Sequence, residues 1–195
     1  MSRPSLENFR SPLAMILFAG TTVVGLVVDL WTKHIAFKHL VTGWLDMRVP
    51  DSSTYPFIAG WVHFHATANY GAVFGLGQGQ RLVFLAVSIL AIGFLSYLFA
   101  ASGRQRFYQF VLGLLLAGVL GNLYDRIVFG YVRDMIYIFP GWRNPLGGLF
   151  PAWQELFPWI FNVADAMLCV GVALMLFYSV FLAPREQKIE DAKPA

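Results

Sequence analysis

Residues Leu82–Ala101 read LVFLAVSILAIGFLSYLFAA, a run that contains no charged side chain. Three other uncharged runs have a similar length: SPLAMILFAGTTVVGLVV at Ser11–Val28, FYQFVLGLLLAGVLGNLY at Phe107–Tyr124 and AMLCVGVALMLFYSVFLA at Ala166–Ala183. A helix of roughly 18 residues covers about 27 Å, close to the hydrocarbon thickness of a bilayer. The sequence therefore predicts four transmembrane helices, at about 11–34, 82–101, 107–125 and 162–183.

The composition excludes a soluble domain. Of the 195 residues, 57% are hydrophobic and 13% are charged, and the mean hydropathy is +0.60. Soluble domains are about 45–50% apolar and about 25% charged. Disorder requires low hydrophobicity, and a disulfide scaffold requires more than the single Cys169. We therefore expect an all-α membrane protein, a four-transmembrane-helix bundle that forms a single integral membrane domain over residues 1–195.

The distribution of basic residues predicts the orientation of this bundle. Four spans place both termini on one side, and the first helix is expected to be retained because no small-x-small cleavage site follows it before Asp29. The positive-inside rule puts the densest basic segments, and so both termini, in the cytoplasm. The net charge of +3 and the pI near 9.1 then reflect membrane anchoring, and no nucleic-acid partner is predicted. The basic residues that decide this are Arg3, Arg10, Arg104, Arg106, Arg185, Lys188 and Lys193.

Two long connections, 39–81 and 126–161, are then expected outside the cytoplasm. Trp61–Thr67 alternates apolar and polar residues, which predicts a strand and hence a small extracytoplasmic β-element. Between Pro140 and Trp159 the chain is rich in Pro, Gly and Trp. That mixture favours a structured interfacial loop at headgroup depth, with membrane lipid as its partner.

Polar residues collect at the outer ends of the predicted spans. Such a concentration at membrane depth indicates one polar site at the outer leaflet boundary. Its members are Asp29, Lys33, Asn69, Asn122, Asp125, Arg126, Asp134, Asn162 and Asp165.

Most of these residues also allow a structural interpretation. Asp29 and Lys33 are spaced i,i+4 on one helix face and suit a salt bridge, and Asp125 beside Arg126 resembles an internal charge pair. An asparagine three residues before an aspartate, as at Asn122 and Asn162, more often caps a helix or bonds across helices than takes part in catalysis.

Asp134 and Asp165 differ because neither has an obvious cation at helical spacing. Arg133 adjoins Asp134, but neighbouring side chains of an extended chain point to opposite faces. Two close carboxyl groups in a poorly hydrated site share a proton, so that one acts as acid and the other as base. For Asp134 and Asp165, an acid–base dyad is therefore one interpretation, and structural and ion-conducting roles are the alternatives. His63 and His65 share a strand face without an evident third ligand, and no metal or cofactor is predicted.

Five motifs occur in order along the chain and resemble those of lipoprotein signal peptidase (signal peptidase II), the aspartyl protease of the bacterial inner membrane. They are Asp29-Leu-Trp-Thr-Lys33, Asn69-Tyr-Gly-Ala-Val-Phe-Gly75, Gly121-Asn-Leu-Tyr-Asp-Arg126, Val132-Arg-Asp134 and Phe161-Asn-Val-Ala-Asp165.

The resemblance implies a specific activity. The family removes the signal peptide from prolipoproteins, cleaving before a diacylglyceryl-modified cysteine, with its active site at the outer, periplasmic leaflet and without a metal or cofactor. The residues that match its catalytic aspartates are Asp134 and Asp165. The resemblance assigns substrate binding or support of the site to Asn69, Gly71, Asn122, Asp125, Arg126, Asn162, Asp29 and Lys33, and we expect a monomer.

The chain departs from the family pattern at a few positions. Leu30 stands where Gln is common, Gly75 where Ser is frequent, and Arg133 and Met135 flank Asp134 where Val and Phe are usual. An apparent insertion around Trp142–Trp159 lengthens the segment between the two aspartates. These differences are expected to affect substrate preference and the outer loop rather than the reaction.

Two other classes of function remain as alternatives. A small transporter or proton-conducting protein needs polar groups through the whole bilayer depth, whereas the inner halves of the four runs carry no charged group. A non-catalytic assembly subunit would tolerate asparagine in place of Asp134 or Asp165.

Overall fold

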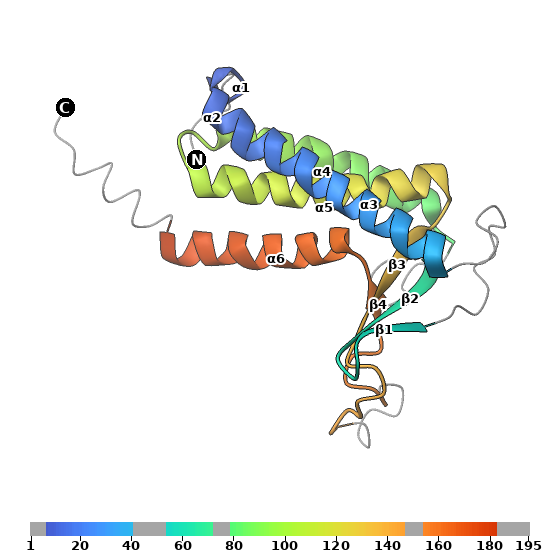
Figure 1. Ribbon diagram of the computed structural model, residues 1–195. Helices are drawn as coiled ribbons and strands as arrows, with labels where there is room; N and C mark the ends of the chain where they lie inside the picture. The colour runs from blue at the N-terminus through green and yellow to red at the C-terminus, as the bar shows by residue number, and fades with distance from the viewer. Residues whose placement is uncertain (1–6, 41–53, 72–78, 147–153, 183–195) are drawn as a thin grey trace. The chain divides into compact units, whose positions relative to one another are not determined.

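The computed structural model describes residues 7–40, 54–71, 79–146 and 154–182 (Figure 1). Within these ranges, four helices are long and apolar enough to cross a membrane: Pro12–Leu40, Arg81–Ala101, Arg106–Val128 and Val163–Leu182. This confirms the prediction of four spanning helices. The first helix runs on to Leu40, past its predicted end near residue 34, and so includes His39, which the sequence had placed in the first outer connection.

The first spanning helix is built from several consecutive helical segments. A short helix, α1 (Glu7–Arg10), precedes α2 (Pro12–Met15), whose N-cap is Ser11 and whose first position is a proline, both typical of a helix start. One π-helical turn, η1 (Ile16–Gly20), then leads into α3 (Thr21–Leu40). Thr22 Oγ1 donates to the carbonyl oxygen of Phe18 at 2.7 Å, which satisfies a backbone group in this irregular turn.

The other spanning helices follow the remaining apolar runs. They are α4 (Arg81–Ala101), α5 (Arg106–Val128) and α6 (Val163–Phe177), the last continued by the π-helical segment η3 (Tyr178–Leu182). The most apolar window of α5 is 61% buried, against 17–22% in the other three spans. Apolar side chains such as Val24, Leu90 and Leu176 are exposed on those three, as expected of helices that face lipid.

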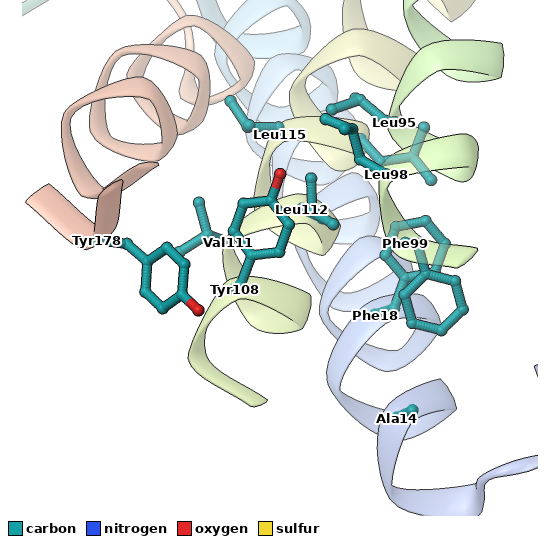
Figure 2. Packing of buried hydrophobic residues seen from close by; sticks show 11 residues of the cluster. Ala14, Phe18, Leu95, Leu98, Phe99, Tyr108, Val111, Leu112, Leu115 and Tyr178 are labelled. Atoms are coloured by element: carbon teal, nitrogen blue, oxygen red, sulfur yellow. The ribbon is translucent and has the colours of Figure 1, made fainter. Parts of the chain in front are cut away.

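The chain divides into two compact units. The first comprises Met1–Leu26, Ile89–Leu120 and Ala164–Ala195. Its core joins η1, α4, α5 and η3: the ring of Phe18 stacks on that of Phe99 at 4.1 Å, and the ring of Tyr108 stacks on that of Tyr178 at 5.2 Å (Figure 2).

Small residues let the helices of this unit approach closely. A Cβ atom added to Gly118 would lie 2.7 Å from the carbonyl oxygen of Ala164 and from Cγ of Leu168. One added to Gly25 would lie 2.8 Å from Cβ of Ala117. Close helix contacts at Ala117 and Gly118 agree with the small-residue packing typical of membrane helices.

The second unit comprises Val27–Ser88 and Gly121–Val163 and contains an antiparallel sheet in the order β1-β2-β3-β4. The strands are β1 (Thr54–Ile58), β2 (Val62–Asn69), β3 (Val132–Ile138) and β4 (Ile160–Phe161). Strand β2 confirms the strand predicted at 61–67, whereas β1, β3 and β4 were not predicted. The register pairs Thr67 with Asp134 and Asn69 with Val132, so the far end of β2 lies beside the start of β3.

A second apolar cluster fixes β3 in this unit. Met135 and Ala66 are buried together with Phe37 from α3 and with Tyr131, the residue just before β3. Because side chains alternate along a strand, Met135 and Arg133 lie on one face of β3 and Asp134 on the other.

Candidate active site

Asp134 is buried at the start of β3, and both of its carboxylate oxygens accept side-chain amide hydrogen bonds. Asn162, the residue just before α6, donates from Nδ2 to Oδ1 at 2.6 Å. Asn69, at the end of β2, donates from Nδ2 to Oδ2 at 3.0 Å. Two other elements therefore set the orientation of this carboxyl group, which is 1% exposed. A carboxyl group held in this way can give or take a proton at a fixed position.

A chain of hydrogen bonds leads from Asp134 to the first spanning helix. Asn162 Nδ2 also donates to Asn122 Oδ1 on α5 at 3.2 Å, and Lys33 Nζ on α3 donates to the same oxygen at 3.1 Å. Lys33 then pairs with Asp29 at 2.8 Å, with both side chains fully buried. The i,i+4 salt bridge expected between Asp29 and Lys33 is thus present, and it belongs to the same polar network as Asp134.

Asp125 forms ion pairs with Lys33 and Arg133 rather than with the expected Arg126. Its ion pairs run from Oδ2 to Lys33 Nζ at 3.2 Å and from Oδ1 to Arg133 Nη2 at 2.8 Å. Nε and the backbone N–H of Arg133 also donate to Asp125, at 3.1 Å and 2.9 Å. The internal pair predicted with Arg126 is therefore wrong, because a helical residue directs its side chain to a different face from that of its immediate neighbour.

Arg126 lies half-buried on α5 and contacts the segment that follows β2. Its Nη2 donates to the carbonyl oxygen of Gly71 at 3.1 Å, and its guanidinium lies 4.9 Å from the ring centre of Phe84. The N–H of Gly71 in turn donates to Asn69 Oδ1 at 2.9 Å. Arg126 and Gly71 thereby fix the turn that presents Asn69 to Asp134. Residues 72–75 of the Asn69–Gly75 motif lie outside the described residues.

Asp165 stands in the first turn of α6, where an acidic residue interacts favourably with the helix dipole. It is half-buried and belongs to the first compact unit. The other predicted site residues all belong to the second unit and are joined by the contacts given above: Asp29, Lys33, Asn69, Gly71, Asn122, Asp125, Arg126, Asp134 and Asn162.

One residue of this network, Arg133, was missed by the sequence analysis as a member of the site. It is 4% exposed, and its guanidinium lies 4.3 Å from the ring centre of Phe129. The alternation of side chains along an extended segment already directed Arg133 away from Asp134. This alternation excludes a contact between the Arg133 guanidinium and Asp134, but it does not identify Asp125 as the partner of Arg133.

Two tyrosines near the site have raised pKa values. Burial raises the pKa of Tyr131. The nearby Tyr70 and Asp125 raise it further, whereas the charge of Arg133 lowers it. Burial and the hydrogen bond that Tyr137 Oη donates to Glu155 raise the pKa of Tyr137 to about 12. Both hydroxyls therefore stay protonated at neutral pH. Within the described residues, no cluster of three or more His, Cys, Asp or Glu side chains has the geometry of a metal site.

Comparison with known proteins gives consistent matches over most of the chain. A family model described as signal peptidase (SPase) II matches residues 21–181. A lipoprotein signal peptidase of Acinetobacter baumannii is 34% identical over 182 residues, which cover 91% of this chain and 90% of that protein. One of Rhodopirellula baltica is 33% identical over 168 residues, which cover 84% of this chain and 71% of that protein.

The fold also has a solved counterpart. A bacterial membrane enzyme structure, determined by the in meso method at 2.3 Å resolution, matches with a TM-score of 0.66 and 25% identity, over 90% of this chain and 92% of that one. This match and the four helices long and apolar enough to span a membrane show that the protein is a multi-pass membrane protein. The chain belongs to the signal peptidase II family of membrane peptidases.

Proposed function

We propose that the protein is a membrane aspartyl endopeptidase that removes the signal peptide from diacylglyceryl-modified prolipoproteins, cleaving before the lipidated cysteine. Membership of the signal peptidase II family and relatives named lipoprotein signal peptidase support the substrate class. The observation that carries the proposal is the buried Asp134 carboxyl group, oriented by the amides of Asn69 and Asn162.

Asp134 and Asp165 are proposed to form the catalytic dyad. Asp165 follows Asn162 by three residues, so consecutive Cα spacings of about 3.8 Å keep its Cα within about 11 Å of that of Asn162. Because Asn162 itself donates to Asp134, chain connectivity alone supports a position for Asp165 near Asp134.

The proposed reaction is hydrolysis by an activated water. The ionised member of the dyad takes a proton from water, whose oxygen attacks the scissile carbonyl carbon, while the protonated member donates to the carbonyl oxygen. The tetrahedral intermediate collapses with cleavage of the C–N bond, and the leaving amine takes up a proton. The products are the carboxyl terminus of the signal peptide and the free amino group of the lipidated cysteine.

The remaining network is proposed to keep this geometry rigid. Asn69 and Asn162 orient Asp134, and the buried charges of Asp29, Lys33 and Asp125 tie α3 and α5 together. A rigid frame matters because a displacement of about 1 Å in a catalytic group costs about 100-fold in rate.

The membrane is proposed to set the depth of the substrate. In this arrangement a monomer, a single membrane domain over residues 1–195, lies in the bacterial inner membrane with both termini in the cytoplasm and its site at the outer leaflet. An aromatic cluster in the second unit supports an interfacial position for the loop after β3: the ring centre of Trp142 lies 5.0 Å from that of Trp61 and 5.3 Å from that of Phe139. Trp61 and Trp142 remain exposed, as in aromatic belts at lipid headgroups.

The test is cleavage of a purified diacylglyceryl-modified prolipoprotein, followed as a shift in gel mobility. Wild type should cleave it, whereas Asp134→Asn and Asp165→Asn should not, although both should accumulate in the membrane as wild type does. Glu7→Gln on α1 makes the same carboxyl-to-amide change outside the site and should leave cleavage intact. Cleavage by either aspartate variant at a rate near that of wild type would overturn the dyad.

A further inference from the structure

Arg133 makes more polar contacts with Asp125 than any other described residue does. Its Nη2, Nε and backbone N–H all donate to that carboxylate, at 2.8, 3.1 and 2.9 Å. The guanidinium also lies over two rings, 4.3 Å from the centre of Phe129 and 5.9 Å from that of Phe37. A guanidinium that donates twice to Asp125 Oδ1 and lies over two rings has little freedom to move, and the backbone N–H of Arg133 donates to Oδ2 of the same carboxylate. The residue is therefore held through both backbone and side chain.

We call these contacts of Arg133 with Asp125 the clamp, and it acts on the residue next to the proposed catalytic carboxyl group. Arg133 immediately precedes Asp134 on β3, and the two side chains leave the strand on opposite faces. Asp125 thus holds β3 through Arg133 on one face of the strand, while Asn69 and Asn162 hold the Asp134 carboxylate on the opposite face. Without the contacts between Arg133 and Asp125, the backbone of β3 at Asp134 would be held only through the Asp134 side chain and the strand pairing.

Arg133 also completes the charge balance of the buried network. Asp29 and Asp125 carry two negative charges, and Lys33 and Arg133 carry two positive ones, all on side chains exposed by 5% or less. Removal of the guanidinium leaves one uncompensated negative charge close to Asp134. Among the described residues, further ionisable groups around this cluster are Arg126 on α5, Tyr131 before β3 and Tyr70 after β2.

We propose that Arg133 is a positioning residue for the peptidase reaction: by clamping Asp125 it holds the strand that carries Asp134 and keeps the surrounding buried charges neutral. This inference rests on the proposed function, because it concerns the same carboxyl group. Arg133 does not touch the substrate in this role, so it should act on kcat and on the pH dependence rather than on KM.

The experiment compares Arg133→Met, Arg133→Lys and Arg143→Met in the prolipoprotein cleavage assay, with rates normalised to folded enzyme. Methionine removes the charge and the hydrogen bonds, and lysine keeps the charge but loses the planar fork. Arg143 is exposed in the loop after β3, so its methionine variant is a matched control for the loss of an arginine.

For Arg133→Met, kcat should fall about 10- to 100-fold with KM nearly unchanged, and the acid limb of the pH–rate profile should move to higher pH. Arg133→Lys should lower kcat less and keep the wild-type pH profile, and Arg143→Met should match wild type throughout. Should Arg133→Met not fold, the lysine variant alone decides, through a lower kcat at constant KM.

A wild-type kcat in both Arg133 variants, or a lower kcat in Arg133→Met without any movement of the pH profile, would overturn the proposal. A merely structural role gives the first result, because normalisation to folded enzyme removes any loss of folded protein from kcat. If wild type itself fails to cleave, the proposed function falls together with this inference. An active wild type with unaffected Arg133 variants removes the inference alone.

Discussion

Asn162 donates a hydrogen bond of 2.6 Å to Asp134, although 28 positions separate the two residues in the sequence. The sheet explains this contact. Strand β4 pairs with β3 so that Phe161 lies opposite Ile136, and the next residue of the chain arrives beside Asp134. From there the chain enters α6, which carries Asp165 in its first turn. A two-residue strand therefore brings Asn162, the residue just before α6, to the buried carboxyl group.

The first prediction concerns this amide. Asn162→Ala removes a donor to Asp134 and leaves Asn122 without one of its partners, so kcat for prolipoprotein cleavage should fall about 10- to 100-fold. Asn8→Ala is the matched control: it deletes a buried amide that bonds to Phe99 and Ser102 in the first unit, and so it should lower stability but not kcat per folded molecule. Equal kcat values for the two variants would contradict the orienting role of Asn162.

The second prediction concerns the buried charge of Lys33. Lys33→Met removes the cation between Asp29 and Asp125, so Asp29 loses this ion pair while Asp125 retains the one with Arg133. Unfolding in detergent should therefore become easier by about 3–5 kcal/mol. Lys38→Met, at an exposed position of the same helix, should change stability little.

A double variant tests whether charge is the cause. Asp29→Asn combined with Lys33→Met should be more stable than the sum of the two single effects, because Asp29→Asn removes the carboxylate whose ion pair Lys33→Met breaks. Additive effects in denaturant unfolding would show that packing of the lysine chain, rather than its charge, accounts for the loss.

The helices and local pairs of this protein were predictable because their signals are local in sequence. A membrane-spanning helix requires an apolar run of a given length, and the salt bridge of Asp29 with Lys33 requires only that the two residues stand four positions apart on a helix. Both were expected and both are present.

The partners of Asp125 were not predictable in the same way. Arg126 is nearest in sequence, but Arg133 reaches Asp125 only after the chain has left α5, turned at Gly130 and entered β3. Strand β3 was itself missed, since VRDMIYI alternates poorly and its pairing with β2 joins segments about 70 residues apart. Contacts of this kind depend on strand register, which a single sequence specifies weakly.

The third prediction concerns the link between Tyr137 and Glu155, which ties the loop after β3 to the sheet. The fold raises the pKa of Tyr137 from its ordinary value of 10.0 to about 12, so it favours the protonated phenol. The resulting stabilisation is complete below pH 10 and is lost as the pH rises towards about 12. Thermal unfolding of wild type should show this alkaline decline, and Tyr137→Phe should lack this part of it.

Tyr55 on β1 provides the control for that measurement. It is exposed, so Tyr55→Phe should keep the alkaline decline of wild type. If Tyr137→Phe and Tyr55→Phe decline alike, the hydrogen bond to Glu155 does not contribute to the stability of the sheet.

The fourth prediction compares two glycines on membrane helices. A methyl group at Gly118 would lie 2.7 Å from the carbonyl oxygen of Ala164, a backbone atom that cannot move without shifting the start of α6. Gly118→Ala should therefore cost about 1–3 kcal/mol in unfolding experiments. At Gly93 on α4 no described atom beyond the nearby backbone of the same helix lies within 4 Å of the added Cβ. Gly93→Ala should therefore stabilise the helix by about 0.5–1 kcal/mol. Opposite signs in the two variants test the close helix contact directly, and a neutral Gly118→Ala would contradict it.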